Sequence, residues 1–313
     1  MSVPLGRTVE VRVPATSANL GPGFDTMGLA LAVYDELEVT ATAAGVSVEV
    51  SGVGAGLVPT DESHLVVRAI RRAFDHVGVP MPGLQLRARN VIPHGGGLGS
   101  SAAAIVSGLV AAQGLLSGIA ELDLPTLLVL ADELEGHPDN VAPALYGGLT
   151  IAWTTESGPR AKKLIVHRGV WPLVCVPSVS VPTELARSLQ PESVPYRDAV
   201  FNLSRSALLV AALTQSPELL LEATEDRLHQ DYRASAMPAT YELVHRLRRE
   251  GFAAVVSGAG PSVLVLADDP SRRLVAAELV AQETAESWTV LMPAVDFKGA
   301  TVNLHPVEAA ARP

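Results

Sequence analysis

The segment Pro93-His94-Gly95-Gly96-Gly97-Leu98-Gly99-Ser100-Ser101-Ala102-Ala103-Ala104 is the most informative part of this chain. Four glycines fall within positions 95–99, and a run of small apolar residues with helical character continues to about residue 116. Backbone with so few β-carbons can approach a ligand closely and turn several N–H groups toward it. Those donors continue into the first turn of a helix, where the positive dipole end favours an anion. We therefore expect a polyphosphate site, the simpler alternative being a flexible loop ahead of a buried helix.

Two other phosphate-binding patterns fit the sequence poorly. The P-loop ends in Gly-Lys-Ser/Thr, and the 313 residues contain no Gly-Lys pair. The dinucleotide fingerprint G-x-G-x-x-A matches at Gly97, Gly99 and Ala102, and an acidic residue, Glu121, lies about 20 positions further on. However, residues 84–89 ahead of the loop alternate between apolar and polar types, as in a half-exposed antiparallel strand. The first strand of a dinucleotide-binding fold is a continuous apolar run.

Three further blocks accompany the glycine loop along the chain. Residues 13–25 read VPATSANLGPGFD, residues 135–143 read EGHPDNVAP, and residues 257–262 read SGAGPS. In order, spacing and wording, from about residue 9 to residue 261, the chain resembles the GHMP small-molecule kinases. The first block has TSAN at residues 16–19, where the isoprenoid-pathway members usually carry a lysine. In this block the chain is similar to the branch of the family that phosphorylates L-homoserine.

The resemblance implies an α+β fold with the two-domain GHMP kinase architecture. The N-terminal ATP-binding domain, expected at residues 1–165, would be like the second domain of ribosomal protein S5. The C-terminal domain, expected at residues 166–313, would be ferredoxin-like. Apolar periodicity and turn residues also predict individual elements. Predicted strands lie at 8–13, 34–42, 46–50, 84–89, 149–153, 162–167, 172–176, 253–257 and 262–267, and predicted helices at 64–77, 101–116, 126–135, 183–189, 198–213, 217–229, 238–250 and from about 270.

The same resemblance implies a set of site residues. The expected ATP-binding residues are Pro93, His94, Gly95, Gly96, Gly97, Leu98, Gly99, Ser100, Ser101, Ala102 and Ala103. The expected substrate-binding residues are Asn19, Asp25, His137, Asp139, Asn140, Arg187 and Arg233, of which Asp25, Asp139 and Arg187 are also expected to be catalytic.

The chemistry of L-homoserine suits these residue types. Two guanidinium groups, Arg187 and Arg233, can bind a carboxylate through paired hydrogen bonds. Asp25, Asp139 and Asn19 can accept from the ammonium and the hydroxyl. Each arginine taken singly could instead be an ordinary surface cation, and Asn or Asp in a turn often satisfies its own backbone.

Mg²⁺ is the expected metal, and the resemblance assigns it to Ser101 and Glu135. A hydroxyl is a poor magnesium ligand alone, so a carboxylate must help. Glu133 is the alternative carboxylate, and an acidic residue late in a helix can also be plain solvated surface. One of the two serines, Ser100 or Ser101, is further expected to cap the helix.

A dedicated general base is not required by this pattern. Phosphoryl transfer passes through a loose transition state, so positioning and charge neutralisation supply most of the rate. None of the four blocks contains a lysine. Asp25 and Asp139 are the candidates if a base exists, while His137 is expected to line the pocket. The turn at 258–262 is expected to be structural, beside the nucleotide loop.

Composition limits the binding partners and the cellular location that we expect. The net charge is −10 and the pI about 5.3, so the surface repels nucleic acid and the nucleotide is expected as Mg²⁺–ATP. Cys175 is the only cysteine, which points to a reduced compartment. Without a signal core or a long apolar span, a cytoplasmic protein without membrane contact is expected.

Several alternatives remain open at this stage. A GHMP kinase for another small alcohol is the nearest alternative to the homoserine hypothesis. A non-catalytic nucleotide-binding regulator and an S5-like RNA-binding protein belong to other classes, and the negative charge weighs against the latter. The expected partner is a small-molecule substrate, and the oligomeric state stays undecided, with a homodimer as one option.

Overall fold

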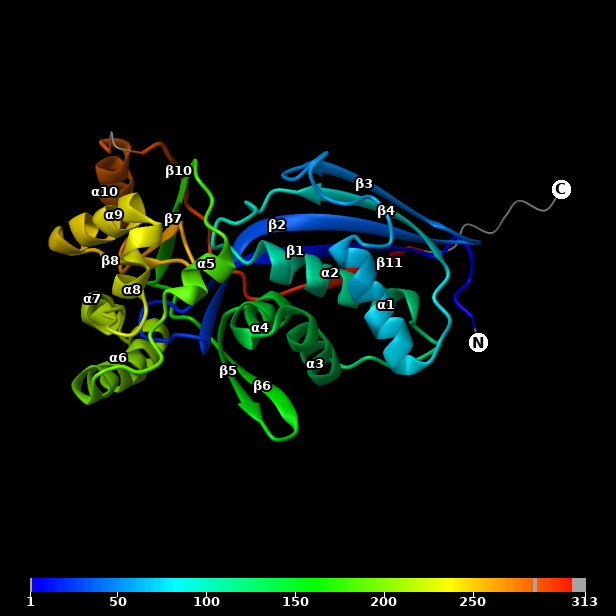
Figure 1. The fold of residues 1–313 in the computed structure, drawn as a ribbon, viewed down its shortest axis with the longest axis horizontal. Helices are drawn as coiled ribbons and strands as arrows, with labels where there is room; N and C mark the ends of the chain where they lie inside the picture. Colours follow the sequence, from blue (N-terminus) through cyan, green and yellow to red (C-terminus); the bar gives the residue numbers. More distant parts are fainter. Residues whose placement is uncertain (1, 284–285, 306–313) are drawn as a thin grey trace.

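Two β-sheets organise the protein, as a computed structural model that describes residues 2–283 and 286–305 shows (Figure 1). The larger sheet and its helices form one end of an elongated molecule, and the smaller sheet forms the other. Within those ranges no helix has both the length and the apolar character needed to cross a membrane.

The larger sheet has the strand order β11-β1-β2-β4-β3, with β5 pairing to β2 and β6 to β5. All pairs are antiparallel except β3 with β4. Its strands are β1 (Thr8–Ala18), β2 (Met27–Thr42), β3 (Val46–Gly52), β4 (Gly83–Asn90), β5 (Leu149–Thr155), β6 (Gly158–Leu164) and β11 (Thr301–His305).

Helices cover one face of this sheet (Figure 1). They are α1 (Leu65–Val77), α2 (Ser100–Leu115), α3 (Leu124–Glu135) and α4 (Pro138–Tyr146). Strand β4 shows the resulting asymmetry, because Leu84 and Leu86 are buried whereas Arg87 and Arg89 are exposed. Helix α2 lies at the centre of this layer and is apolar on almost every side, as expected for a helix surrounded by protein.

The smaller sheet has the strand order β10-β7-β9-β8, all antiparallel. Its strands are β7 (Trp171–Pro177), β8 (Ala253–Val256), β9 (Val263–Ala267) and β10 (Trp288–Leu291), and helices separate β7 from β8 and β9 from β10. This is the order of a ferredoxin-like βαββαβ unit. The fold class predicted from the sequence is confirmed.

Helices pack on both faces of the smaller sheet, which explains why its strands read as continuous apolar runs. Leu173 and Cys175 pack with residues of α9 (Pro238–Arg249) and α10 (Pro270–Ala281). Val174, between them, belongs to a different core cluster, which contains residues of α6 (Tyr196–Thr214) and α7 (Leu220–Ala223). The same cluster contains buried residues of the larger sheet, so α6 shares a core with that domain.

Some predicted elements differ from the structure. The helix predicted over 217–229 is wrong. The chain there forms a 3₁₀ turn (Pro217–Leu219), the short α7, and then a turn in which Asp226 accepts hydrogen bonds from backbone N–H groups. An aspartate that bonds its own backbone competes with the helical pattern. The start of β2 at Met27 and the elements α4, β10 and β11 were not predicted.

The last strand returns to the larger sheet. Strand β11 falls within the expected C-terminal domain, 166–313, yet it pairs with β1. Val295 likewise forms an isolated bridge with Leu31. We propose that the domains divide near residue 165 and that residues 295–305 belong to the N-terminal one.

Gly108 offers a test of the packing between α1 and α2. A β-carbon on Gly108 would collide with the carbonyl oxygen of Val66. We expect Gly108→Ala to lower the free energy of unfolding by about 1–3 kcal/mol through overpacking. Helix propensity alone would instead raise it by about 1 kcal/mol. Urea unfolding measures the sign, and Ala207→Gly on the exposed face of α6 calibrates propensity in the same protein. A stabilised Gly108→Ala variant would contradict the packing described.

Candidate active site

A cavity of about 390 Å³ lies where the glycine loop, the loop after β1, the start of α4 and the C-terminal domain meet. It brings together all seven expected substrate-binding residues: Asn19, Asp25, His137, Asp139, Asn140, Arg187 and Arg233. Most of the expected ATP-binding residues line it as well: Pro93, His94, Gly95, Gly96, Gly97, Gly99, Ser100 and Ser101. The side chains of Leu98, Ala102 and Ala103 lie instead in the hydrophobic core.

The carbonyl groups of residues 95–98 in the glycine loop are all bound by surrounding protein. One bond comes from β1 and three from the C-terminal domain. The bonds are Val181 N to Gly95 O (3.4 Å), Ser262 N to Gly96 O (3.3 Å), Ser257 Oγ to Gly97 O (2.7 Å) and Thr16 N to Leu98 O (3.1 Å).

This anchoring orients the N–H groups of the loop. In a planar trans peptide the N–H points away from the preceding carbonyl oxygen. The N–H groups of residues 96–99 therefore face away from the protein that binds the carbonyls. Among the described residues, the N–H groups of 95–101 donate no hydrogen bond, and the helix ladder begins after them. Such a row of N–H groups, continued by a helix N-terminus, forms an anion site.

Two glycines of the loop are required by close contacts. Gly97 and Gly99 have φ values of 75° and 68°. A β-carbon on Gly97 would collide with the carbonyl oxygen of Ser257, and one on Gly99 with Oγ1 of Thr16. Gly99 is also the N-cap of α2, without a side-chain cap. The predicted serine cap is wrong, because the chain enters the helix through a left-handed glycine.

Ser101 and Glu135 meet at the mouth of this anion site. Ser101 Oγ donates to Glu135 Oε2 at 2.7 Å, and burial raises the pKa of Glu135. The alternative carboxylate, Glu133, instead pairs with Arg72 at 2.7 Å. No group of three or more metal-binding His, Cys, Asp or Glu side chains occurs in the described chain. A hydroxyl and a carboxylate beside a phosphate site still fit Mg²⁺, which takes few protein oxygens and completes its shell with phosphate and water.

The start of α4 supplies a buried carboxylate. The side chain of Asp139 is only 3% exposed, and its Oδ1 lies 3.0 Å from Nδ1 of His137. This hydrogen bond raises the pKa of His137, although burial opposes the shift. Asn140, the next residue, accepts from Thr16 Oγ1 at 2.7 Å.

Two arginines supply positive charge to the cavity. Arg187, on α5 (Thr183–Ser188), pairs with Asp25 at 2.9 Å. Arg233 is 1% exposed, and its Nη1 lies 3.4 Å from the carbonyl oxygen of Gly258. Burial lowers the pKa of Arg233, yet a guanidinium stays charged in proteins.

Asn19 lines the cavity but has its amide engaged elsewhere. Its Nδ2 donates to Gly258 O at 2.8 Å, and its Oδ1 accepts from the N–H of Asp25 at 2.9 Å. It joins the loop after β1 to the turn at 258–262. That turn contacts the glycine loop through Ser262, as the sequence predicts.

Comparison with known proteins shows the family of this chain. The chain matches the models of the N-terminal and C-terminal domains of GHMP kinases over residues 64–148 and 208–283. It is 69% identical over 300 residues to a homoserine kinase of Clavibacter michiganensis, covering 96% of this chain and 95% of the relative. The chain belongs to the homoserine kinases of the GHMP family.

Two more distant homoserine kinases extend the comparison. That of Streptomyces avermitilis is 51% identical over 295 residues, covering 94% of this chain and 95% of the relative. The crystal structure of the one from Cytophaga hutchinsonii superimposes with a TM-score of 0.84 at 27% identity, covering 95% and 97% of the two chains. Both comparisons cover at least 94% of each chain.

The sequence analysis missed several residues of this site. Thr16 and Ser257 carry no charge, yet they bind the glycine loop, and Ser17 Oγ bonds Ser257 Oγ at 2.8 Å. In the sequence, these residues could have been found from their positions in the first and last of the four blocks. Buried His229 carried no signal, because it lies outside all four blocks.

The pair of His137 and Asp139 gives a pH prediction. Because the folded pKa of His137 is raised, the pair stabilises the fold fully below about pH 6.5, the unfolded value. This stabilisation is lost as the pH rises through the folded pKa. We expect Asp139→Asn to lower the pKa of His137 in a ¹³C–¹H NMR titration of the histidines.

Asp139→Asn should also destabilise the fold more at pH 6 than at pH 9, measured by urea unfolding. The same change made in a His137→Gln background is the control, and there the dependence on pH should vanish. A pKa of His137 that Asp139→Asn leaves unmoved would refute the assignment.

Proposed function

We propose that this enzyme transfers the γ-phosphoryl group of ATP to the side-chain hydroxyl of L-homoserine, giving O-phospho-L-homoserine and ADP. The observation that carries the proposal is one cavity lined by an anion cradle, by the guanidinium groups of Arg187 and Arg233 and by the carboxylates of Asp25 and Asp139. The names of the relatives support this substrate.

The phosphates of ATP would bind the glycine loop. The N–H groups of residues 95–101 and the N-terminus of α2 are fixed before the nucleotide arrives, because the loop carbonyls are anchored. Preorganised donors stabilise developing charge without reorganisation during the reaction. The net charge of −10 gives no general attraction for ATP, so these local donors must supply it.

Ser101 and Glu135 would hold Mg²⁺. A bound Mg²⁺ supplies charge neutralisation to the phosphates. The raised pKa of Glu135 falls back when a cation or another positive group lies nearby, because opposite charge favours the carboxylate form. A bound Mg²⁺ would therefore stabilise the ionised form of Glu135.

The amino acid would bind beside Arg187 and Arg233. Arg187 and Arg233 would bind its carboxylate, and Asp25 would hold Arg187 in place through their 2.9 Å ion pair. Asp139, with His137 and Asn140 beside it, would accept from the ammonium or the hydroxyl. Asn19 would act by holding the loop that carries Asp25.

The reaction forms an oxygen–phosphorus bond at the hydroxyl, breaks the bond between the γ-phosphorus and the bridging oxygen, and releases the hydroxyl proton. A loose transition state asks little of a base. Either Asp139 or Asp25 would accept that proton as it leaves. Positioning of the two substrates within the cavity would then account for most of the rate.

Coupled ADP release with Mg²⁺–ATP tests the proposal, comparing L-homoserine with mevalonate, galactose, L-serine and L-threonine. We expect strong stimulation by L-homoserine alone, and loss of most of this rate in Glu135→Gln. Turnover with another alcohol only would overturn the substrate, and no turnover with any acceptor would favour a nucleotide-binding regulator.

The carboxylate site has its own prediction. A charge-assisted hydrogen bond contributes about 1.5–3 kcal/mol, so Arg233→Met should lower kcat/KM for L-homoserine about 10- to 100-fold or more. The reaction of 3-aminopropan-1-ol, which lacks the carboxylate, should change much less. Arg205→Met, which removes a cation paired with Glu225 outside the cavity, is the matched control. Equal losses for both alcohols would remove the carboxylate from this site.

A further inference from the structure

The loop that carries Asp25 has a strained backbone. Asn19, Leu20 and Asp25 have φ values of 70°, 51° and 51°, in the left-handed region that non-glycine residues seldom adopt. Such conformations persist only where the surroundings enforce them. The contacts that enforce them therefore control where Asp25 lies.

Several of these contacts come from the C-terminal domain. Asn202 Nδ2 and Ser206 Oγ both donate to the carbonyl oxygen of Pro22, at 3.2 and 2.6 Å. The imidazole of His229 bonds the carbonyl oxygen of Gly21 through Nε2 at 2.8 Å. Its ring also stacks on Phe24, with the centroids 4.8 Å apart and the planes at 16°.

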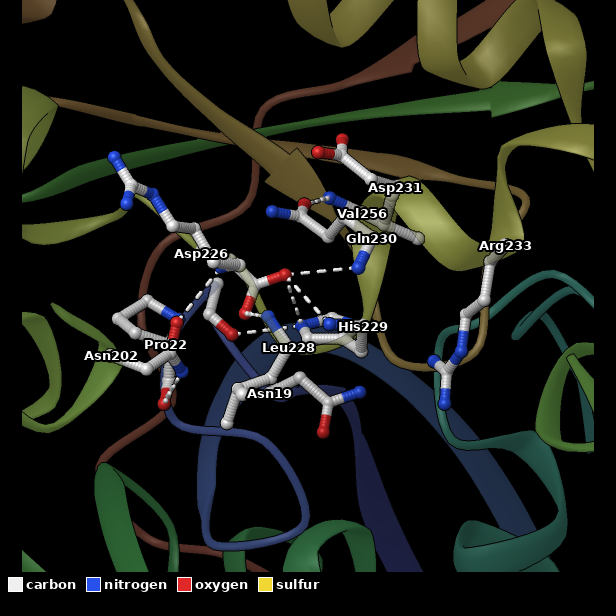
Figure 2. Close-up of polar contacts among 12 residues, drawn as sticks. Asn19, Pro22, Asn202, Asp226, Leu228, His229, Gln230, Asp231, Arg233 and Val256 are labelled. Atoms are coloured by element: carbon white, nitrogen blue, oxygen red, sulfur yellow. Dashed lines mark hydrogen bonds and ion pairs between the residues drawn. The ribbon is translucent and has the colours of Figure 1, made fainter. Parts of the chain in front are cut away.

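His229 is itself held by a polar network (Figure 2). The carboxylate of Asp226 accepts from three successive N–H groups, those of Leu228, His229 and Gln230, at 2.9–3.0 Å. Asn202, which binds the loop through its Nδ2, accepts through Oδ1 from the N–H of residue 227 at 2.9 Å. Asn202 and His229 thus connect the turn at residues 226–230 to the strained loop at residues 19–25.

The partners of His229 fix its chemical form. A carbonyl oxygen can only accept, so Nε2 must carry the proton. Nδ1 is buried and has no hydrogen-bond partner in the described part of the chain. The ring is fully buried, and burial lowers its pKa; Arg233 lowers it further, while Asp226 and Asp25 oppose the shift. His229 is therefore a neutral donor.

His229 also adjoins Arg233, the second residue that we propose to bind the substrate. Its carbonyl oxygen accepts from the N–H of Arg233 at 3.3 Å, across the single turn of α8 (Gln230–Arg233). Figure 2 shows Arg233 extending from this turn. His229 does not line the cavity. It therefore touches both the loop of Asp25 and the turn of Arg233 without reaching the substrate.

We propose that His229 is a positioning residue, whose neutral imidazole locks the strained loop 19–25 to the turn that carries Arg233 and so sets the spacing of the groups that bind L-homoserine. The inference rests on the proposed function for its substrate. It concerns the groups that bind the amino acid, since within the described residues no hydrogen bond joins the glycine loop to His229.

Two variants separate the contributions of the ring. His229→Gln keeps an N–H donor at about the reach of Nε2 and loses the stacking, whereas His229→Phe keeps a ring on Phe24 and loses the donor. We expect His229→Phe to lower kcat/KM for L-homoserine at least tenfold, with the KM for ATP within threefold of wild type. His229→Gln should recover a large part of that loss.

Hydrogen–deuterium exchange gives a readout that needs no turnover. In His229→Phe the amides of residues 19–25 should exchange faster, while those of 95–101 stay unchanged. Leu213→Ala, which removes a buried side chain of α6, is the control: it should lower Tm without either effect.

The outcomes distinguish this inference from the proposed function. Wild type inactive on L-homoserine would refute the function, and the exchange data would still decide the role of His229. Unchanged exchange at 19–25, an equal rise in KM for both substrates, or variants that lose Tm but keep kcat/KM would overturn the positioning role.

Discussion

The hydrogen bonds to the carbonyl groups of the glycine loop are the constraint on which the rest of the site depends. Each carbonyl of residues 95–98 is bound by a neighbouring segment, so the opposite side of the loop presents only N–H groups. Without these bonds, a segment so rich in glycine would sample many conformations, and ordering it around a phosphate would cost conformational entropy. The anchors convert a flexible sequence into a preformed anion site.

The hydrogen bonds to the glycine loop come from both sheets. Thr16 comes from β1 of the larger sheet, whereas Ser257 and Ser262 come from the turn between β8 and β9 of the smaller one. Neither sheet alone can hold the loop. The strained segment 19–25 follows the same rule, because its carbonyls are bound by α6 and by the turn at 226–229. The glycine loop and the segment 19–25 therefore both depend on the interface between the domains.

Sequence reasoning reached the architecture and most of the cavity, for physical reasons. Alternating residues in β4 and the apolar runs of β7 and β9 report burial directly. Gly97 and Gly99 stand where other side chains would collide, so the loop was visible as a pattern. The carboxylates and arginines of the cavity were found through the resemblance of whole blocks rather than from their own spacing.

What sequence reasoning missed depends on contacts between distant segments. Strand β11 is short and mostly exposed, and its pairing with β1 makes it a strand. Asp226 interrupts an apolar helical pattern through local bonds that periodicity does not register. His229 gained its role from Gly21 and Phe24, roughly two hundred residues earlier in the chain, and no local pattern encodes such a distance.

The central claim is that the N–H groups of the glycine loop bind the phosphates of the nucleotide. Selective ¹⁵N-glycine labelling and a titration with Mg²⁺–ADP would follow the amides of Gly95, Gly96, Gly97 and Gly99 directly. The account predicts large, saturable shifts at Gly96, Gly97 and Gly99 with Mg²⁺–ADP and small ones with adenosine, which lacks phosphate. Saturation by Mg²⁺–ADP with those three amides unmoved would contradict it.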